Sequence, residues 1–320
     1  MSPNLLIMRT QNFGDISVTK VLDGTEKFNA AIAFPGVNLD HFQQHLDWIS
    51  PFYDFDSESI IISTHSYVVK TPEFTAIVDT CIGNNKNRIG SGPLFKANKG
   101  VLSQWNNRNS NYLDNLMQSG VNPEEVDYVM CTHMHADHVG WNTKLENGHW
   151  VPTFPNAQYL FSQIELDGML EQTGNPFDEY LRLVYEDSVF PIIQSGQSII
   201  IDSDFDLGKG ITILPTPGHS PGHYCIELRA HNAVGILTGD VLHNPIQVCY
   251  PHWTTMFCED KEQANKTRMK LVDDLTDTDI IVLAAHFSGT TAGKIVSNSC
   301  LLYTSPSPRD ATLSRMPSSA

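Results

Sequence analysis

Residues 131–141 read CTHMHADHVGW and place three histidines and one aspartate within six positions. His133 and His135 are two residues apart, so both side chains can point to one side of an extended loop. Asp137 and His138 follow after a bend and point elsewhere. Imidazole nitrogens and carboxylate oxygens are ligands of zinc and related first-row ions. The pattern favours a metal site over the alternative, a polar turn in which Asp137 only caps backbone amides.

Three later segments place further candidate ligands directly after strand-like runs of apolar residues. They are the histidines of TPGHSPGH (His219 and His223), the aspartate of TGD (Asp240) and the last residue of DIIVLAAH (His286). Loops at the ends of strands commonly carry catalytic residues on a rigid scaffold. Because several such loops each supply a candidate ligand, we expect the loops to meet at one edge of the fold and form a catalytic site there.

The elements that would position these residues alternate between strand and helix patterns. Strand patterns with β-branched residues include 17–24, 59–80 with a turn at 70–72, 126–132, 157–161, 198–202, 211–217, 224–229, 233–240 and 279–286. Helical patterns cover 110–120, 164–172, 177–191 and 261–275. Residues 31–56 are aromatic and irregular, as in a lid or pocket insertion. Blocks of strands with helices between them, occurring twice, predict an α/β fold with two sheets packed face to face and helices outside.

The ordered set of motifs resembles the metallo-β-lactamase-fold hydrolase superfamily. The resemblance rests on VDT at 78–80, THMHADH at 132–138, TPGHSPGH, TGD and His286, and it covers about residues 17–295. It implies an αββα sandwich of two mixed β-sheets. It also implies two metal ions, zinc with iron or manganese as alternatives. The implied ligands are His133, His135 and His219 for one metal, Asp137, His138 and His286 for the other, and Asp240 as the bridge.

The resemblance further implies roles around the metals. Asp79 and His223 would lie behind the ligands and orient them, with a satisfied core histidine as the alternative for His223. Asp137 and Asp240 would be the catalytic residues of a dinuclear hydrolase, in which a hydroxide shared by the metals attacks an ester-like bond. An aspartate at position 240, where zinc β-lactamases of this kind use cysteine, points away from those enzymes.

The segment at 138–161 resembles a lactonase-like and organophosphate-hydrolase-like branch of the superfamily. We therefore expect a small-molecule lactone, or a related carboxylic or phosphoric ester, as substrate. Side chains that could line its pocket, with ordinary core packing as the alternative for each, are Trp141, His243, Tyr250, His252 and Trp253. Three other functions on this fold stay open: a glyoxalase II-like thioesterase, an iron-dependent oxidoreductase such as a persulfide dioxygenase, and a scaffold without catalysis.

Composition narrows the choice of partners. Without residues 300–320, which carry two arginines and one aspartate, the chain has 18 basic and 35 acidic side chains and a net charge of −17. Nucleic acid is disfavoured because phosphate binding needs clustered lysine and arginine. No apolar run approaches the roughly twenty residues that span a bilayer. The five cysteines before residue 300 are odd in number and form no CxxC pair, which favours a reducing, cytoplasmic location. Homodimer assembly stays open.

Residues 300–320, CLLYTSPSPRDATLSRMPSSA, are rich in serine and proline and show no apolar periodicity. They resemble translated read-through of a sequencing adapter, and such segments are excluded from fold reasoning. We therefore expect one domain over residues 1–299, with its native C-terminus truncated, followed by an artefactual, disordered tail. The segment AGKIVSN at 292–298 is expected to begin a strand of the second sheet.

Overall fold

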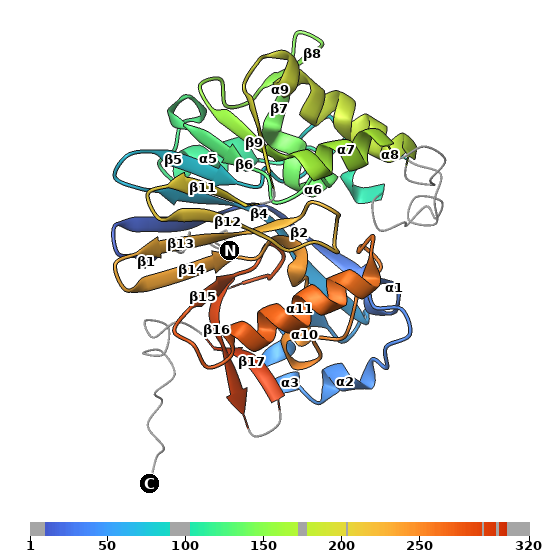
Figure 1. Ribbon diagram of the computed structural model, residues 1–320. Coiled ribbons are helices and arrows are strands. Elements are labelled where there is room, and N and C mark those ends of the chain that lie inside the picture. The colour runs from blue at the N-terminus through green and yellow to red at the C-terminus, as the bar shows by residue number, and fades with distance from the viewer. Residues whose placement is uncertain are drawn as a thin grey trace, which may run out of the picture.

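The computed structural model describes residues 10–89, 103–171, 178–202, 204–289, 291–298 and 301–305. These residues form two large mixed β-sheets packed face to face, with helices on the outer faces (Figure 1). The predicted fold class, an αββα sandwich, is confirmed. Within the described residues, no helix is both long and apolar enough to cross a membrane.

The first sheet has eight strands, in the order β1-β2-β4-β5-β6-β9-β10 with β3 paired to β4. The strands are β1 (Thr10–Phe13), β2 (Ile16–Asn29), β3 (Tyr53–Asp54), β4 (Ser59–Lys70), β5 (Thr75–Val78), β6 (Tyr128–Met130), β9 (Gln158–Ser162) and β10 (Ser198–Ile201). Strands β5, β6, β9 and β10 run parallel, whereas β1 to β5 pair antiparallel. The carboxyl ends of β5 and β6 therefore meet at one edge, where Asp79 and the histidine-rich segment begin.

The second sheet has seven strands in sequence order, and a separate two-stranded hairpin lies beside the first sheet. The strands are β11 (Phe205–Gly208), β12 (Ile211–Pro215), β13 (Tyr224–Ala230), β14 (Ala233–Leu237), β15 (Ile281–Leu283), β16 (Ala292–Asn298) and β17 (Leu301–Ser305), and the hairpin is β7 (Thr143–Glu146) with β8 (His149–Pro152). The sequence interpretation missed this hairpin. Its turn, Asn147-Gly148, has positive φ at both residues, which is a strong hairpin signal.

Alternating side chains of the strands serve two hydrophobic cores. On β4 and β5, Val69 and Val78 pack between the sheets, whereas Val68 and Ile77 face the helices. The inner core is completed by apolar side chains of the second sheet, such as Leu228. Because successive residues of a strand point to opposite faces, an unbroken apolar run covers both cores at once.

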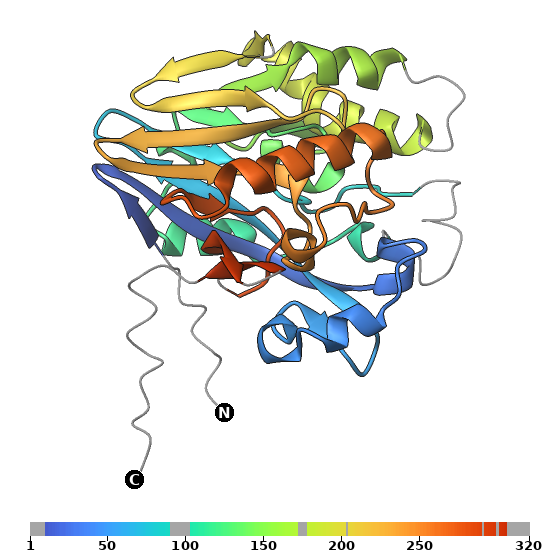
Figure 2. The ribbon, with the colours of Figure 1, turned by 60° about the horizontal axis from the view of Figure 1, so that its bottom comes forward.

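Helices cover the outer faces of both sheets. The helices are α1 (Ala30–Ala33), α2 (Asp40–Gln43), α3 (Leu46–Ile49), α5 (Tyr112–Gln118), α6 (Ala136–Val139), α7 (Gln163–Glu171), α8 (Asp178–Val184), α9 (Phe190–Gln194), α10 (Ile246–Cys249) and α11 (Lys261–Leu275). Figure 2 shows α11 lying across the second sheet, where Leu271 and Val272 are buried. The helix predicted at 177–191 is two helices, because a π-helical turn at Tyr185–Val189 separates α8 from α9.

The end of the described chain differs in part from the expectation. The strand predicted at 292–298 is confirmed as β16. Residues Leu301–Ser305, expected to be disordered, form β17 and pair antiparallel with β16, because an edge strand offers unpaired backbone groups to a following segment. Residues 306–320 lie outside the described part, and the adapter origin of the tail and the single domain at 1–299 stay predictions.

Candidate metal centre

The histidine-rich segment changes direction in two places. It bends at Thr132 and His133, and it turns again where His135, with a ψ of 157°, leads into α6 at Ala136. His133 and His135 therefore precede the helix, whereas Asp137 and His138 lie in its single turn. All three histidines of the segment and Asp137 lie in the donor groups described below.

His133, His135 and His219 form one group of candidate metal ligands. The Nε2 atom of His219 lies 3.1 Å from Nε2 of His133 and 2.9 Å from Nδ1 of His135. The outer nitrogen of His135, Nε2, faces Glu259 at 3.4 Å. Two loops that are far apart in sequence, at 133–135 and after β12, thus aim three imidazoles at one point.

Asp137, His138 and His286 form a second group, and Asp240 lies between the two groups. Oδ2 of Asp137 lies 3.6 Å from Nε2 of both His138 and His286. The Asp240 carboxylate places Oδ2 3.2 Å from Nε2 of His219 in the first group. Its Oδ1 lies 3.3 Å from His138 and 3.0 Å from His286 in the second. One carboxylate therefore contacts both groups.

The donor atoms fit metal ions in spacing and in chemical type. Ligands bound at about 2.1 Å to a tetrahedral ion lie about 3.4 Å apart. The separations given above run from 2.9 to 3.6 Å, and Nε2 of His133 lies 3.9 Å from Oδ2 of Asp240. Nε2 of His138 is buried and forms no hydrogen bond with any described residue. A buried polar atom without a hydrogen bond is costly, so a cation between the groups would satisfy it.

Electrostatics also suit metal binding. Burial holds the pKa of His133 and His219 well below the usual histidine value, which keeps them neutral. Burial raises the pKa of Asp240, but the surrounding histidines outweigh it and hold that pKa well below its usual range. Burial lowers the pKa of His138, but neighbouring carboxylates outweigh it and raise that pKa well above its usual value. Metal binding at His138 would therefore replace a proton.

Asp79 contacts His138 of the second group, and its role behind the metal ligands stays a prediction. Its carboxylate accepts the backbone N–H of Thr132 at 2.8 Å and lies 2.9 Å from Nδ1 of His138. This contact leaves Nε2 of His138 directed at the donor group. Asp79 has a φ of +56°, a left-handed conformation that non-glycine residues seldom adopt. Backbone strain of this kind persists where function over-determines the local structure.

We expect Asp79→Asn to lower activity by about 10- to 100-fold, the usual effect of losing a partner behind a metal-ligating histidine. Asparagine has one acceptor oxygen and an NH2 group, so it cannot accept both the Thr132 N–H and a ring N–H of His138. Steady-state kcat/KM for an ester that the wild-type protein hydrolyses measures the change. Asp127→Asn is the matched control. The Asp127 carboxylate accepts the backbone N–H of Thr75 at the start of β5, whereas Asp79 follows the end of β5. Equal losses in the two variants would contradict the role of Asp79.

His223 supports Asp240 through the backbone. Its Nε2 accepts the N–H of Asp240 at 2.9 Å, and its Nδ1 lies 2.8 Å from Oγ1 of Thr216. Burial lowers the pKa of His223 to about 3, so the ring stays a neutral acceptor. Gly239 has a φ of +48°, and a Cβ there would lie 2.5 Å from His223 Nε2. His223 thus holds the backbone of a candidate ligand, and its place behind the metals stays a prediction.

The residues predicted to line a substrate pocket occupy different environments. Trp141 stacks on Tyr112 at 5.6 Å between ring centroids and is 4% exposed, so the structure places it in the core instead of at a pocket wall. His243 lies beside the donor groups, with its Nε2 3.3 Å from Oδ2 of Asp240. Both ring nitrogens of His243 are buried without a hydrogen bond to a described residue. His243 therefore belongs to the centre itself.

Tyr250, His252 and Trp253 lie with the aromatic insertion. The Tyr250 and Trp253 rings stack at 4.5 Å, and Phe34 and Phe42 of the insertion each lie 5.9 Å from Trp253. His252 and Trp253 line a cavity together with residues 35–38 of the insertion. The insertion thus packs on these aromatics, but no metal-donor residue lines this cavity, and the role of the insertion as a pocket segment stays a prediction.

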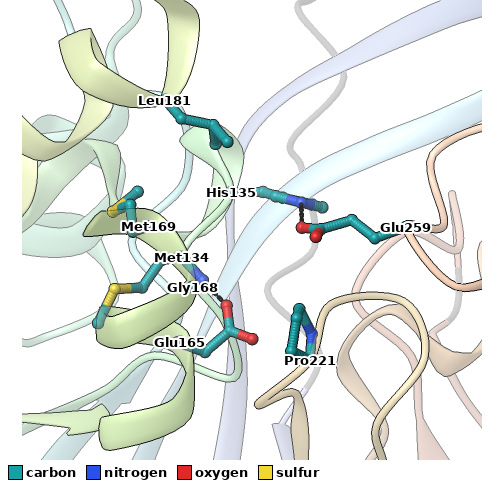
Figure 3. A pocket seen from close by; sticks show the side chains of 8 residues that line it. All are labelled: Met134, His135, Glu165, Gly168, Met169, Leu181, Pro221 and Glu259. Atoms are coloured by element: carbon teal, nitrogen blue, oxygen red, sulfur yellow. Dashed lines mark hydrogen bonds and ion pairs between the residues drawn. The ribbon is translucent and has the colours of Figure 1, made fainter. Parts of the chain in front are cut away.

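A different cavity adjoins the donor groups at His135 (Figure 3). Its lining residues are Met134, His135, Glu165, Gly168, Met169, Leu181, Pro221 and Glu259. None of the predicted pocket residues is among them. The sequence interpretation missed both carboxylates, Glu165 and Glu259, because neither lies next to a recognisable motif.

Comparison with known proteins agrees with the fold. The family profile described as the Metallo-beta-lactamase superfamily matches residues 61–286, and the chain belongs to that family. An N-acyl homoserine lactonase of Bacillus thuringiensis is 24% identical over 173 residues, which are 53% of this chain and 60% of the relative. The chain thus matches less than two thirds of that relative's length. The predicted family is confirmed.

Solved structures share the whole architecture. A structure of the hydrolase AbOPH in the beta lactamase superfamily aligns with a TM-score of 0.76 and 22% identity, over 93% of this chain and 96% of the other. AidC, a dizinc quorum-quenching lactonase in complex with a product, aligns with a TM-score of 0.75 and 19% identity, over 93% and 97%. At these identities the likeness establishes the fold.

Proposed function

We propose that this protein is a dinuclear metal-dependent hydrolase that cleaves a lactone or a related ester bond in a small molecule. The observation that carries the proposal is the contact of Asp240 with both donor groups, at 3.2 Å to His219 and 3.0 Å to His286. A carboxylate with ionised oxygens between two sets of histidines is suited to two adjacent cations. We propose zinc as the metal, because nitrogen and oxygen donors in this arrangement suit it.

Each residue of the centre has a defined role in this proposal. His133, His135 and His219 would hold one ion, and Asp137, His138 and His286 the other, with Asp240 shared. When bound, the metals supply an activated water as nucleophile and polarise the scissile carbonyl. Asp79 keeps the ring of His138 in place, and His223 does the same for Asp240.

The substrate class rests on two supports. The matched relatives are N-acyl homoserine lactonases, so an acylated lactone is the first candidate. The net charge of −16 disfavours polyanions such as nucleic acids. We also propose a cytoplasmic location, supported by five free cysteines in the described chain; a homodimer stays a prediction.

Asp137→Ala tests the proposal directly. We expect it to lower kcat/KM for a lactone by at least about tenfold, since Asp137 is a candidate metal donor. The free energy of unfolding should change by much less than the activation free energy of hydrolysis. Hydrolysis rates of the metal-loaded protein and urea unfolding of the metal-free protein measure the two effects. Asp56→Ala, an exposed carboxylate, is the control and should retain full activity. An unchanged rate in Asp137→Ala would remove Asp137 from the mechanism.

A further inference from the structure

Glu165, in the first turn of α7, joins two loops of the metal centre. Its side chain is 6% exposed. Oε2 accepts the backbone N–H of Met134 at 3.0 Å, and Oε1 accepts the backbone N–H of Gly222 at 2.6 Å. Figure 3 shows the Glu165 carboxylate directed at the Met134 backbone, on the wall of the cavity that also contains His135.

The two backbone groups that Glu165 binds lie within the ligand loops. Met134 stands between His133 and His135, and Gly222 lies three residues after His219. The loops come from opposite sheets, since one follows β6 of the first sheet and the other follows β12 of the second. A single carboxylate therefore connects the two loops that supply all three histidines of the first donor group.

Packing keeps the second loop close to Glu165. A Cβ added to Gly222 would lie 2.5 Å from Oγ of Ser162 and 2.7 Å from the backbone nitrogen of Glu165. Only glycine allows this approach. The arrangement also requires two acceptor oxygens, because each faces a backbone donor in the buried interior. An amide side chain would present its NH2 group to one of these N–H donors and lose that hydrogen bond.

We propose that Glu165 is a positioning residue that fixes the two ligand loops relative to each other and so preforms the His133, His135 and His219 metal site. The inference rests on the metal centre of the proposed function and extends it to a residue outside the ligand set. Within the described part of the chain, no hydrogen bond or ion pair of Glu165 reaches Asp137, His138 or His286, so its loss should act on one metal site and leave the other.

Zinc binding by the metal-free full-length protein tests this role, with a chromophoric chelator as competitor. For Glu165→Gln we expect one of two binding steps to weaken by about tenfold or more, while the other keeps the wild-type affinity. Glu165→Asp keeps the charge but is one methylene shorter, so the same zinc-binding step should weaken. Gly222→Ala should push the loop away from Glu165 and weaken that step as well. Glu26→Gln is the control, because Glu26 is also 6% exposed but contacts Thr64 and Arg108.

The outcomes separate this inference from the proposed function. A wild-type protein that binds no zinc overturns the proposed centre itself. A wild-type protein with two binding steps, and a Glu165→Gln variant with the same two affinities, overturns only the role of Glu165. Equal weakening in Glu165→Gln and Glu26→Gln also overturns it, because general destabilisation would then explain the loss. If Glu165→Gln does not fold, the Glu165→Asp and Gly222→Ala variants decide by the same criterion.

Discussion

Asp240→Asn is expected to lower kcat/KM for lactone hydrolysis by more than about a hundredfold. Partners behind a metal ligand are worth about 10- to 100-fold, and Asp240 is the donor that touches both groups, through its Oδ2 to His219 and its Oδ1 to His286. Asparagine has the same shape but replaces one anionic oxygen with an NH2 group, which cannot bind a cation. The loss of activity should therefore come from weaker metal binding at the centre and not from a change in packing.

Kinetics and metal content measured on the same sample distinguish these causes. We expect Asp240→Asn to hold less metal than the wild type and to keep its far-UV circular dichroism spectrum. Asp206→Asn, an exposed aspartate on β11, is the matched control and should keep both metal and activity. Wild-type kcat/KM in Asp240→Asn would contradict a shared role for this carboxylate.

Removal of metal by a chelator has the second large expected effect. We expect hydrolysis to stop and the melting temperature to fall, because a ligand at a thousand times its Kd stabilises the native state by about 4 kcal/mol. A bound cation would also attract buried donor atoms that now face one another, among them Nε2 of His219 and Nε2 of His133 at 3.1 Å. Scanning calorimetry before and after chelation, with zinc added back, measures both effects. Full activity in a sample shown to be free of metal would contradict the account.

Local sequence signals predicted the candidate ligands because each one lies in a segment that follows a strand. Asp240 comes three residues after β14, and His286 comes three residues after β15. Strand patterns fix where such side chains emerge, and two packed sheets bring the strand ends together. The order of the motifs then identified the family. The fold class and the convergence of the donors could therefore be predicted without the structure.

Other features depend on contacts that no local pattern encodes. Glu165 binds Met134, 31 residues away, and Gly222, 57 residues away, so its role appears only when the loops meet. An aromatic side chain fits a pocket wall and a core equally well. Trp141 proved to be a core residue through its stacking on Tyr112. His243 gave the opposite result, since it lies at the centre with Asp240.

Metal content combined with a hydrolysis panel tests the central claim most directly. The panel contains N-acyl homoserine lactones, thioesters, phosphotriesters and cephalosporins, and elemental analysis of the same sample gives the metal bound per chain. The two donor groups that share Asp240 predict two equivalents of zinc per chain and fastest hydrolysis of a lactone. One equivalent of iron per chain, with none of these substrates cleaved, would contradict the dinuclear hydrolase and favour an oxidoreductase on the same fold.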